Sequence, residues 1–169
     1  MHFNRKFLAL LFTYTLPALA SVQYQVLPGK LHKKGEVRIT VLPDPETYKV
    51  EMVYKVQAKN LVPIPSKLLN GQTSMEFPVA FKTEEGYKEL ERAGSMEIPK
   101  AIIKFVKRAD FGDLKDAYFL EVFPTNKKSK IHIIYHPSLP EVAWQKVKIT
   151  FLSDIPVLNG YELLAEMRK

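Results

Sequence analysis

Residues 48–59 carry the clearest pattern in the chain, because apolar and polar side chains alternate along the whole stretch. Apolar residues occupy the even positions, and lysine, glutamate or glutamine occupies the odd positions except at Val53. Successive side chains of a β-strand point to opposite faces, so the pattern predicts a half-buried strand roughly 40 Å long. A helix would place Lys55 in the same stripe as Met52 and fits the pattern less well.

The same alternation predicts eight further strands, at 22–27, 36–42, 74–81, 100–107, 117–123, 130–136, 141–152 and 161–167. Residues 36–59 are expected to form a hairpin around the proline-containing turn at 43–47. Two segments, 100–107 and 117–123, are apolar on both faces and are expected to be central in the sheet or covered on both sides. A bulge near Gln145 would keep both apolar sets of 141–152 facing inward.

One segment, 83–93, has helical features. Thr83 is placed as the N-cap, Tyr87 and Leu90 lie three residues apart, and Gly94 follows as a stop. Pro78 predicts an edge position or a bulge for the strand before the helix. Consecutive strands with short turns predict antiparallel pairing. The expected fold class is therefore all-β: an antiparallel β-sandwich or a small closed barrel of about eight to nine strands with one short helix.

The connection at 60–73 is unusually apolar for a loop. Two interpretations remain open for it. It packs as a flap over one end of the core, or it forms a lip over a ligand pocket.

Residues 1–20 have the features of a secretory signal peptide. Arg5 and Lys6 precede an apolar run that ends in a small-residue site, with cleavage expected after Ala20. The run is shorter than the roughly 20 residues of a comfortable membrane-spanning helix. We therefore expect a signal peptide at 1–20 and a single β-rich domain at 21–169.

Composition places the expected domain in the bacterial periplasm or outside the cell. The chain has no cysteine and no Asn-x-Ser/Thr sequon, whereas small secreted eukaryotic domains often carry disulfides or sequons. The net charge of +7, or +5 without Arg5 and Lys6, predicts attraction to an acidic partner such as an anionic membrane surface. Solvated turns explain the same excess. No nucleic-acid partner is expected, since no binding motif is present.

Catalytic and metal-binding motifs are not found in the sequence. His132 and His136 lie four residues apart on one strand, about 13 Å, which is too far for one metal ion. Asp110, Asp113 and Asp116 recur every third residue, but without the spacing of an EF-hand, and a polar turn explains them equally well. Neither a Gly-x-Ser-x-Gly elbow nor a phosphate-binding glycine loop occurs. No metal, cofactor or enzymatic activity is predicted.

Large apolar side chains on the predicted strands are the better functional signal. A small barrel can enclose one ligand, and an ordinary packed core would use the same side chains. The residues predicted to line an apolar ligand cavity are Met52, Tyr54, Phe77, Phe81, Phe105 and Trp144.

The expected function is that of an exported, non-enzymatic binding module of the bacterial envelope. It would hold an apolar small molecule or dock an envelope protein through a strand edge. A structural subunit of an envelope or secretion assembly is one alternative. A small outer-membrane barrel is another, although several predicted strands are shorter than the about 9–11 residues that such a barrel uses.

Overall fold

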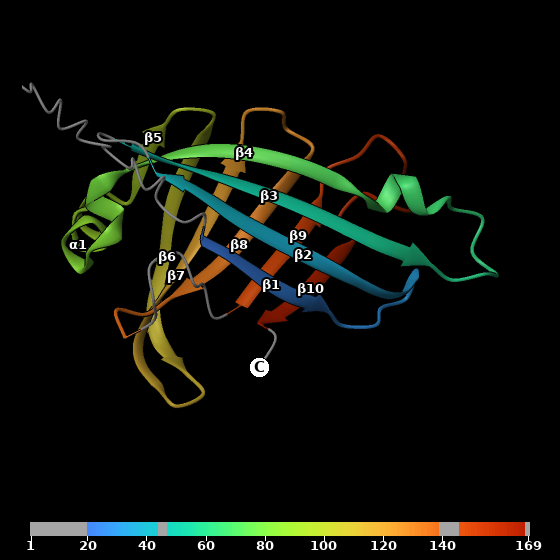
Figure 1. Ribbon diagram of the computed structural model, residues 1–169, viewed down its shortest axis with the longest axis horizontal. Helices are drawn as coiled ribbons and strands as arrows, with labels where there is room; N and C mark the ends of the chain where they lie inside the picture. Colours follow the sequence, from blue (N-terminus) through green and yellow to red (C-terminus); the bar gives the residue numbers. More distant parts are fainter. Residues whose placement is uncertain (1–19, 44–46, 139–145, 168–169) are drawn as a thin grey trace, which may run out of the picture.

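The computed structural model of the chain describes residues 20–43, 47–138 and 146–167 (Figure 1). The elements are β1 (Ala20–Val26), β2 (His32–Pro43), β3 (Thr47–Ala58), η1 (Ser66–Leu69), β4 (Gly71–Pro78), η2 (Val79–Lys82), α1 (Glu84–Ala93), β5 (Ser95–Ile98), β6 (Ala101–Phe111), β7 (Leu114–Pro124), β8 (Ser129–Tyr135), β9 (Lys146–Phe151) and β10 (Glu162–Met167).

The described strands form one antiparallel sheet of ten, in the order β4-β3-β2-β1-β10-β9-β8-β7-β6-β5. Neighbours in space are neighbours in sequence except at one place, where β1 pairs with β10. The sheet curls into a nearly closed barrel, with β4 and β5 as its two edges. The edges meet at a seam, where the Glu76 N–H donates to the Pro99 carbonyl at 3.3 Å and Lys100 pairs with Glu76 at 3.4 Å. The predicted all-β, antiparallel fold is confirmed.

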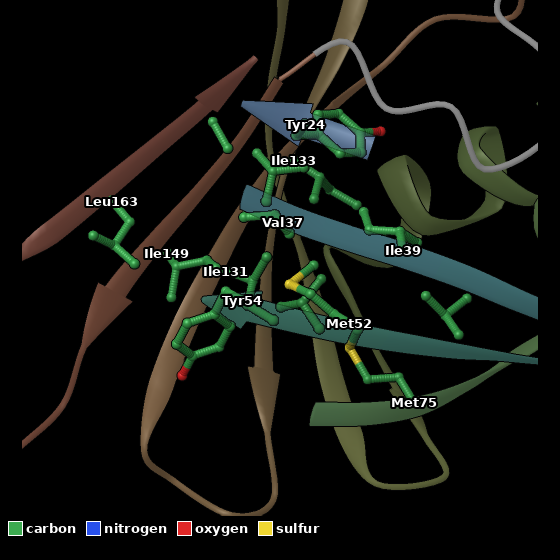
Figure 2. Close-up of a cluster of buried hydrophobic side chains, with 14 of the residues drawn as sticks. Tyr24, Val37, Ile39, Met52, Tyr54, Met75, Ile131, Ile133, Ile149 and Leu163 are labelled. Atoms are coloured by element: carbon green, nitrogen blue, oxygen red, sulfur yellow. The ribbon is translucent and has the colours of Figure 1, made fainter. Parts of the chain in front are cut away.

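Alternation along the strands sorts the side chains between the interior and the outer surface. On β3, Val50, Met52, Tyr54 and Val56 are buried, whereas Lys55 and Gln57 are exposed. Figure 2 shows residues from different strands, among them Tyr24, Met52 and Ile149, pointing into one shared interior. The burial of this continuous apolar core is the main stabilising contribution to the fold.

Helix α1 covers one end of the barrel, between β4 and β5 (Figure 1). Its buried face carries Tyr87 and Leu90. The Tyr87 ring stacks on Tyr135 of β8, with 3.7 Å between centroids and 7° between planes, and Phe81 lies edge-on to Tyr87 at 5.2 Å. Such aromatic pairs fix geometry as well as burying area, so α1 is held firmly against the barrel end.

The sequence and the structure differ in three places. β5 was not predicted, because its four residues are too few to show a period. The strand predicted at 74–81 ends at Pro78, and Phe81 lies instead in η2, where it still faces the core. Residues 100–107 were expected to be central in the sheet or covered on both faces, but β6 is the neighbour of the edge strand β5, and its residues Ile102 and Val106 are exposed. The predicted bulge near Gln145 lies outside the described residues.

Candidate functional site

Three connections meet at the end of the barrel away from α1 and border a cavity of about 440 Å³, which we call the mouth cavity. They are the β3–β4, β7–β8 and β9–β10 connections. Tyr54, Phe151 and Leu158 are buried and form the apolar floor of this cavity. Its rim is formed by partly exposed side chains, namely Leu68 (38% exposed), Leu152 (43%) and Ile155 (40%).

The β3–β4 connection is fixed against the end of β3 by side-chain hydrogen bonds. The Val56 N–H donates to the Asn70 side-chain oxygen at 2.7 Å, and the Ala58 N–H donates to the Ser66 hydroxyl at 3.0 Å. Leu69 is buried beneath the connection, whereas Leu68 borders the cavity. The structure shows part of the segment packed on the core, as one interpretation expected, and part of it bordering the mouth cavity. A role as a lip over a ligand pocket stays a prediction.

Backbone hydrogen bonds close the base of the β9–β10 connection. The Gly160 N–H donates to the Phe151 carbonyl at 2.8 Å, and Gly160 has a φ of 76°, which favours glycine. The Leu152 N–H donates to the Lys128 carbonyl of the β7–β8 connection at 2.9 Å. These bonds turn Leu158 into the core and leave Ile155 at the rim.

Polar and apolar side chains share the lining of the mouth cavity. The polar or charged residues are Lys67, Asn70, Gln72, Asn126, Lys128, Ser153 and Asp154. Burial raises the pKa of the Tyr54 phenol above its usual value. Lys67 and Lys128 border the cavity and offer positive charge, against the one carboxylate of Asp154. Tyr54 and Phe151 meet edge to face at 6.0 Å. The site thus offers apolar surface, aromatic rings and ammonium groups, a combination suited to an apolar or amphipathic molecule with an anionic end.

A larger hollow of about 500 Å³ lies on the outer surface along β2 and β3. Its lining includes the exposed, charged or polar side chains of Lys34, Lys55 and Gln57. Both hollows have many polar lining residues, but Val56 is the one apolar side chain that lines the outer hollow. The mouth cavity also has aromatic and aliphatic side chains, among them Tyr54, Phe151 and Leu158, and is the better candidate for an apolar ligand.

The residues predicted to line a ligand cavity do not gather in one place. Tyr54 borders the mouth cavity, and Met52 lies deeper in the core. Phe77 and Phe81 are buried against each other at 6.1 Å near α1, and the partly buried Phe105 lies 6.4 Å from Tyr118 in the same cluster. Trp144 lies outside the described residues. A ligand-binding role for these residues stays a prediction.

Phe151, Leu158 and the rim of the β9–β10 connection were missed at the sequence level. Phe151 falls within the predicted strand 141–152, and residues 153–160, which contain Pro156 and the Asn159–Gly160 pair, lie between two predicted strands. The available signal was the apolar content of this turn, which carries Ile155, Val157 and Leu158 within four positions.

The acidic loop after β6 is organised by ordinary hydrogen bonds. Asp110 accepts from the Lys115 ammonium at 2.7 Å and from the Asp116 N–H at 3.2 Å. The Lys115 hydrogen bond holds the Asp110 pKa below its usual range. In the part of the chain that the structure describes, no three histidine, cysteine, aspartate or glutamate side chains are grouped so as to hold a metal ion.

The two strand histidines lie in different surroundings. Burial, followed by the nearby Lys148, lowers the pKa of His132, whose ring nitrogen lies 3.4 Å from Glu121. His136 contacts the Ser138 hydroxyl at 2.6 Å and the Lys115 carbonyl at 3.0 Å. Both are held in polar contacts on the outer surface, away from the mouth cavity.

Comparison with protein-family models, with curated proteins and with solved structures found no match. Among the described residues, no helix is long and apolar enough to cross a bilayer.

Proposed function

We propose that the chain is a non-enzymatic binding module that holds a small apolar or amphipathic molecule in the mouth cavity. The observation that carries this proposal is the ring of partly exposed Leu68, Leu152 and Ile155 around a floor of buried aromatic side chains. Apolar surface left in water costs about 25 cal/mol per Å². A ligand that covers this ring would recover that free energy, and Lys67 and Lys128 would attract an anionic end.

The proposed setting is the periplasm of a bacterium or the outside of the cell. The basic, apolar and small-residue order of residues 1–20 supports export. Cleavage after Ala20 would leave Ser21–Val26, which pair with β2 from Thr40 to Gly35, so the sheet would keep β1. Intact-mass analysis of the exported chain tests this. A mass beginning at Ser21 is expected, and retention of the first twenty residues would contradict it.

The mouth cavity is tested with the double variant Leu152→Ser/Ile155→Ser. The probe is 1-anilinonaphthalene-8-sulfonate, an anionic amphiphile, titrated by fluorescence. Removing two apolar rim side chains is expected to weaken binding about tenfold, since it deletes roughly 1–2 kcal/mol of apolar contact. Both residues are exposed in part, so the fold should be retained.

Val157→Ser is the matched control. Val157 lies in the same connection and is more exposed than either rim residue, but it does not border the mouth cavity. It should leave the affinity within about twofold of the parent chain. Equal loss in the two variants, or no loss in the double variant, would refute the proposed site.

A binding module is favoured over an outer-membrane barrel by the direction of the side chains. The interior is apolar, and the outward positions of β2 and β3 carry pairs such as Glu36–Arg38 and Lys49–Glu51. A membrane barrel instead presents apolar side chains to lipid. Docking of an envelope protein at the β4 or β5 edge, and a role as an assembly subunit, stay predictions.

A further inference from the structure

The outer surface of β6 and β7 presents apolar and cationic side chains together. We call it the basic–aromatic face and define it by Ile102, Lys104, Val106, Lys107, Phe119 and Phe123. Register places Ile102 opposite Phe123 and Lys107 opposite Phe119. The intervening residues Ile103, Leu120 and Val122 are buried in the core, so the residues of the basic–aromatic face point outward. Ile102 is 42% exposed and Val106 is 50% exposed.

A strand with two apolar faces normally has both faces covered. Here the second face of β6 remains open, and a shift of register between Phe105 and Lys107 brings Val106 to the outside. Exposed apolar residues that cluster, rather than occurring singly, mark interaction sites.

The lysines of this face lie over its rings. The Lys104 ammonium is 5.0 Å from the Phe123 ring centroid, and the Lys107 ammonium is 5.1 Å from that of Phe119. Lys130 of β8 approaches Phe123 from the other side at 5.9 Å. Lysine stems can cover apolar surface while the charged heads turn to solvent. An approaching anionic layer can therefore draw the ammonium groups outward and leave the phenylalanine rings to insert.

The surface beside the basic–aromatic face carries lysines that are paired with carboxylates. On β8 and β9, Lys130 pairs with Glu121 at 3.3 Å, Lys146 with Glu166 at 3.5 Å and Lys148 with Glu162 at 2.9 Å. The positive charge of the face therefore comes from the exposed Lys104 and Lys107, which lie over its rings. On the opposite side of the barrel, β2 and β3 carry the pairs Glu36–Arg38 and Lys49–Glu51 together with exposed lysines such as Lys55, but without phenylalanine rings beneath them.

We infer that the basic–aromatic face docks on the surface of a lipid bilayer that contains anionic head groups. The cores of protein–protein interfaces are depleted in lysine, whereas surfaces that lie in the membrane interface combine lysine with phenylalanine. Each lysine near an anionic bilayer strengthens binding about fivefold. The association would be reversible and sensitive to salt.

This inference is independent of the mouth cavity, which lies at the end of the barrel and shares no lining residue with the basic–aromatic face. The two proposals can therefore fail separately. Loss of probe binding in Leu152→Ser/Ile155→Ser reports on the cavity, and binding to vesicles reports on the face.

The test is co-sedimentation of the purified chain with vesicles of phosphatidylcholine alone and with vesicles that also contain phosphatidylglycerol. Binding to the anionic vesicles only is expected, with loss at high sodium chloride. The variant Lys104→Gln/Lys107→Gln should weaken this binding at least about tenfold. Val106→Ser, at a half-exposed position, should weaken it about twofold to fivefold by removing apolar contact.

Lys49→Gln/Lys55→Gln is the matched control, because it removes the same charge from the opposite side of the barrel, on β3. It should keep vesicle binding within about twofold of the parent chain. Circular dichroism confirms that each variant is folded. Three results would overturn the inference: no vesicle binding, equal binding to neutral and anionic vesicles, or equal loss in the control and in Lys104→Gln/Lys107→Gln.

Discussion

At the residue scale, His32 and Tyr161 tie the β1–β2 connection to the start of β10. The His32 ring is buried, and its Nε2 lies 2.7 Å from the Leu27 carbonyl. A carbonyl only accepts, so Nε2 carries the proton and donates. The other ring nitrogen then accepts from the Tyr161 hydroxyl at 2.7 Å, and that hydroxyl accepts from the Leu31 N–H at 2.9 Å. Every polar atom in this network has a partner.

The variant Tyr161→Phe should lower the free energy of unfolding by about 1–3 kcal/mol. The ring packing is kept, but the Leu31 N–H and a His32 ring nitrogen lose their partner in a part-buried site. Urea denaturation followed by circular dichroism measures the change.

Tyr118→Phe is the contrasting variant. The Tyr118 hydroxyl is buried without a hydrogen-bond partner among the residues that the structure describes, and burial raises the pKa of this phenol. Removing the hydroxyl should leave stability unchanged or increase it. If the two variants lost equal stability, hydrogen bonding would not explain the Tyr161 effect.

At the element scale, helix α1 shows how local signals and packing act together. Thr83 is the N-cap residue as predicted, and Gly94 ends the helix with a φ of 76° while its N–H donates to the Leu90 carbonyl. The Thr83 hydroxyl, however, donates to the Ala80 carbonyl at 3.0 Å and makes no hydrogen bond to the helix N-terminus. The N-terminus of α1 is therefore held by packing against η2 and not by a side-chain cap.

Gly86→Ala is expected to destabilise the protein by about 1–3 kcal/mol. Helix propensity alone would predict a gain of about 1 kcal/mol. The structure reverses the sign, because a Cβ at Gly86 would stand 2.3 Å from the backbone oxygen of Ala80. Thermal and urea denaturation measure the change.

Glu89→Ala serves as the control, since Glu89 is exposed on the same helix. It should change stability by less than about 0.5 kcal/mol. Stabilisation by Gly86→Ala would mean that α1 does not lie against η2 at this distance.

At the scale of the whole molecule, the two ends of the described chain are paired in the middle of the sheet. Tyr24 of β1 lies opposite Met167 of β10, and β2 and β9 flank this pair. The edges of the sheet come instead from the middle of the sequence, at β4 and β5. Their seam holds the backbone bond from Glu76 to Pro99 and the Lys100–Glu76 ion pair.

The rate of amide hydrogen exchange should depend on where a strand lies in the sheet and not on where it lies in the sequence. Amides of β1 and β10 are expected to be among the slowest to exchange, and those of β4 and β5 among the faster strand amides, because edge strands open locally. Native-state exchange read by mass spectrometry measures this order, with β2 and β9 as internal references. Rapid exchange in β1 and β10 would contradict the central pairing.

Much of the fold could be predicted because period-two alternation is a local property. Val37 and Ile39 alternate with Glu36 and Arg38, and the structure buries the first pair and leaves the second pair at least partly exposed. Alternation cannot say whether a second apolar face is covered, and Ile102 was assigned wrongly for this reason. The mouth cavity was only partly predicted, through the connection at 60–73, because its other walls come from distant turns.

The sequence by itself determined the all-β class, the antiparallel hairpins, the one helix and the inward side of most strands. These features depend on residues two to four positions apart, which the sequence displays directly. Only the tertiary structure decided that β1 joins β10, that β4 meets β5 at the seam, and which apolar face stays open. Those outcomes depend on contacts between residues far apart in the chain, which no local period encodes.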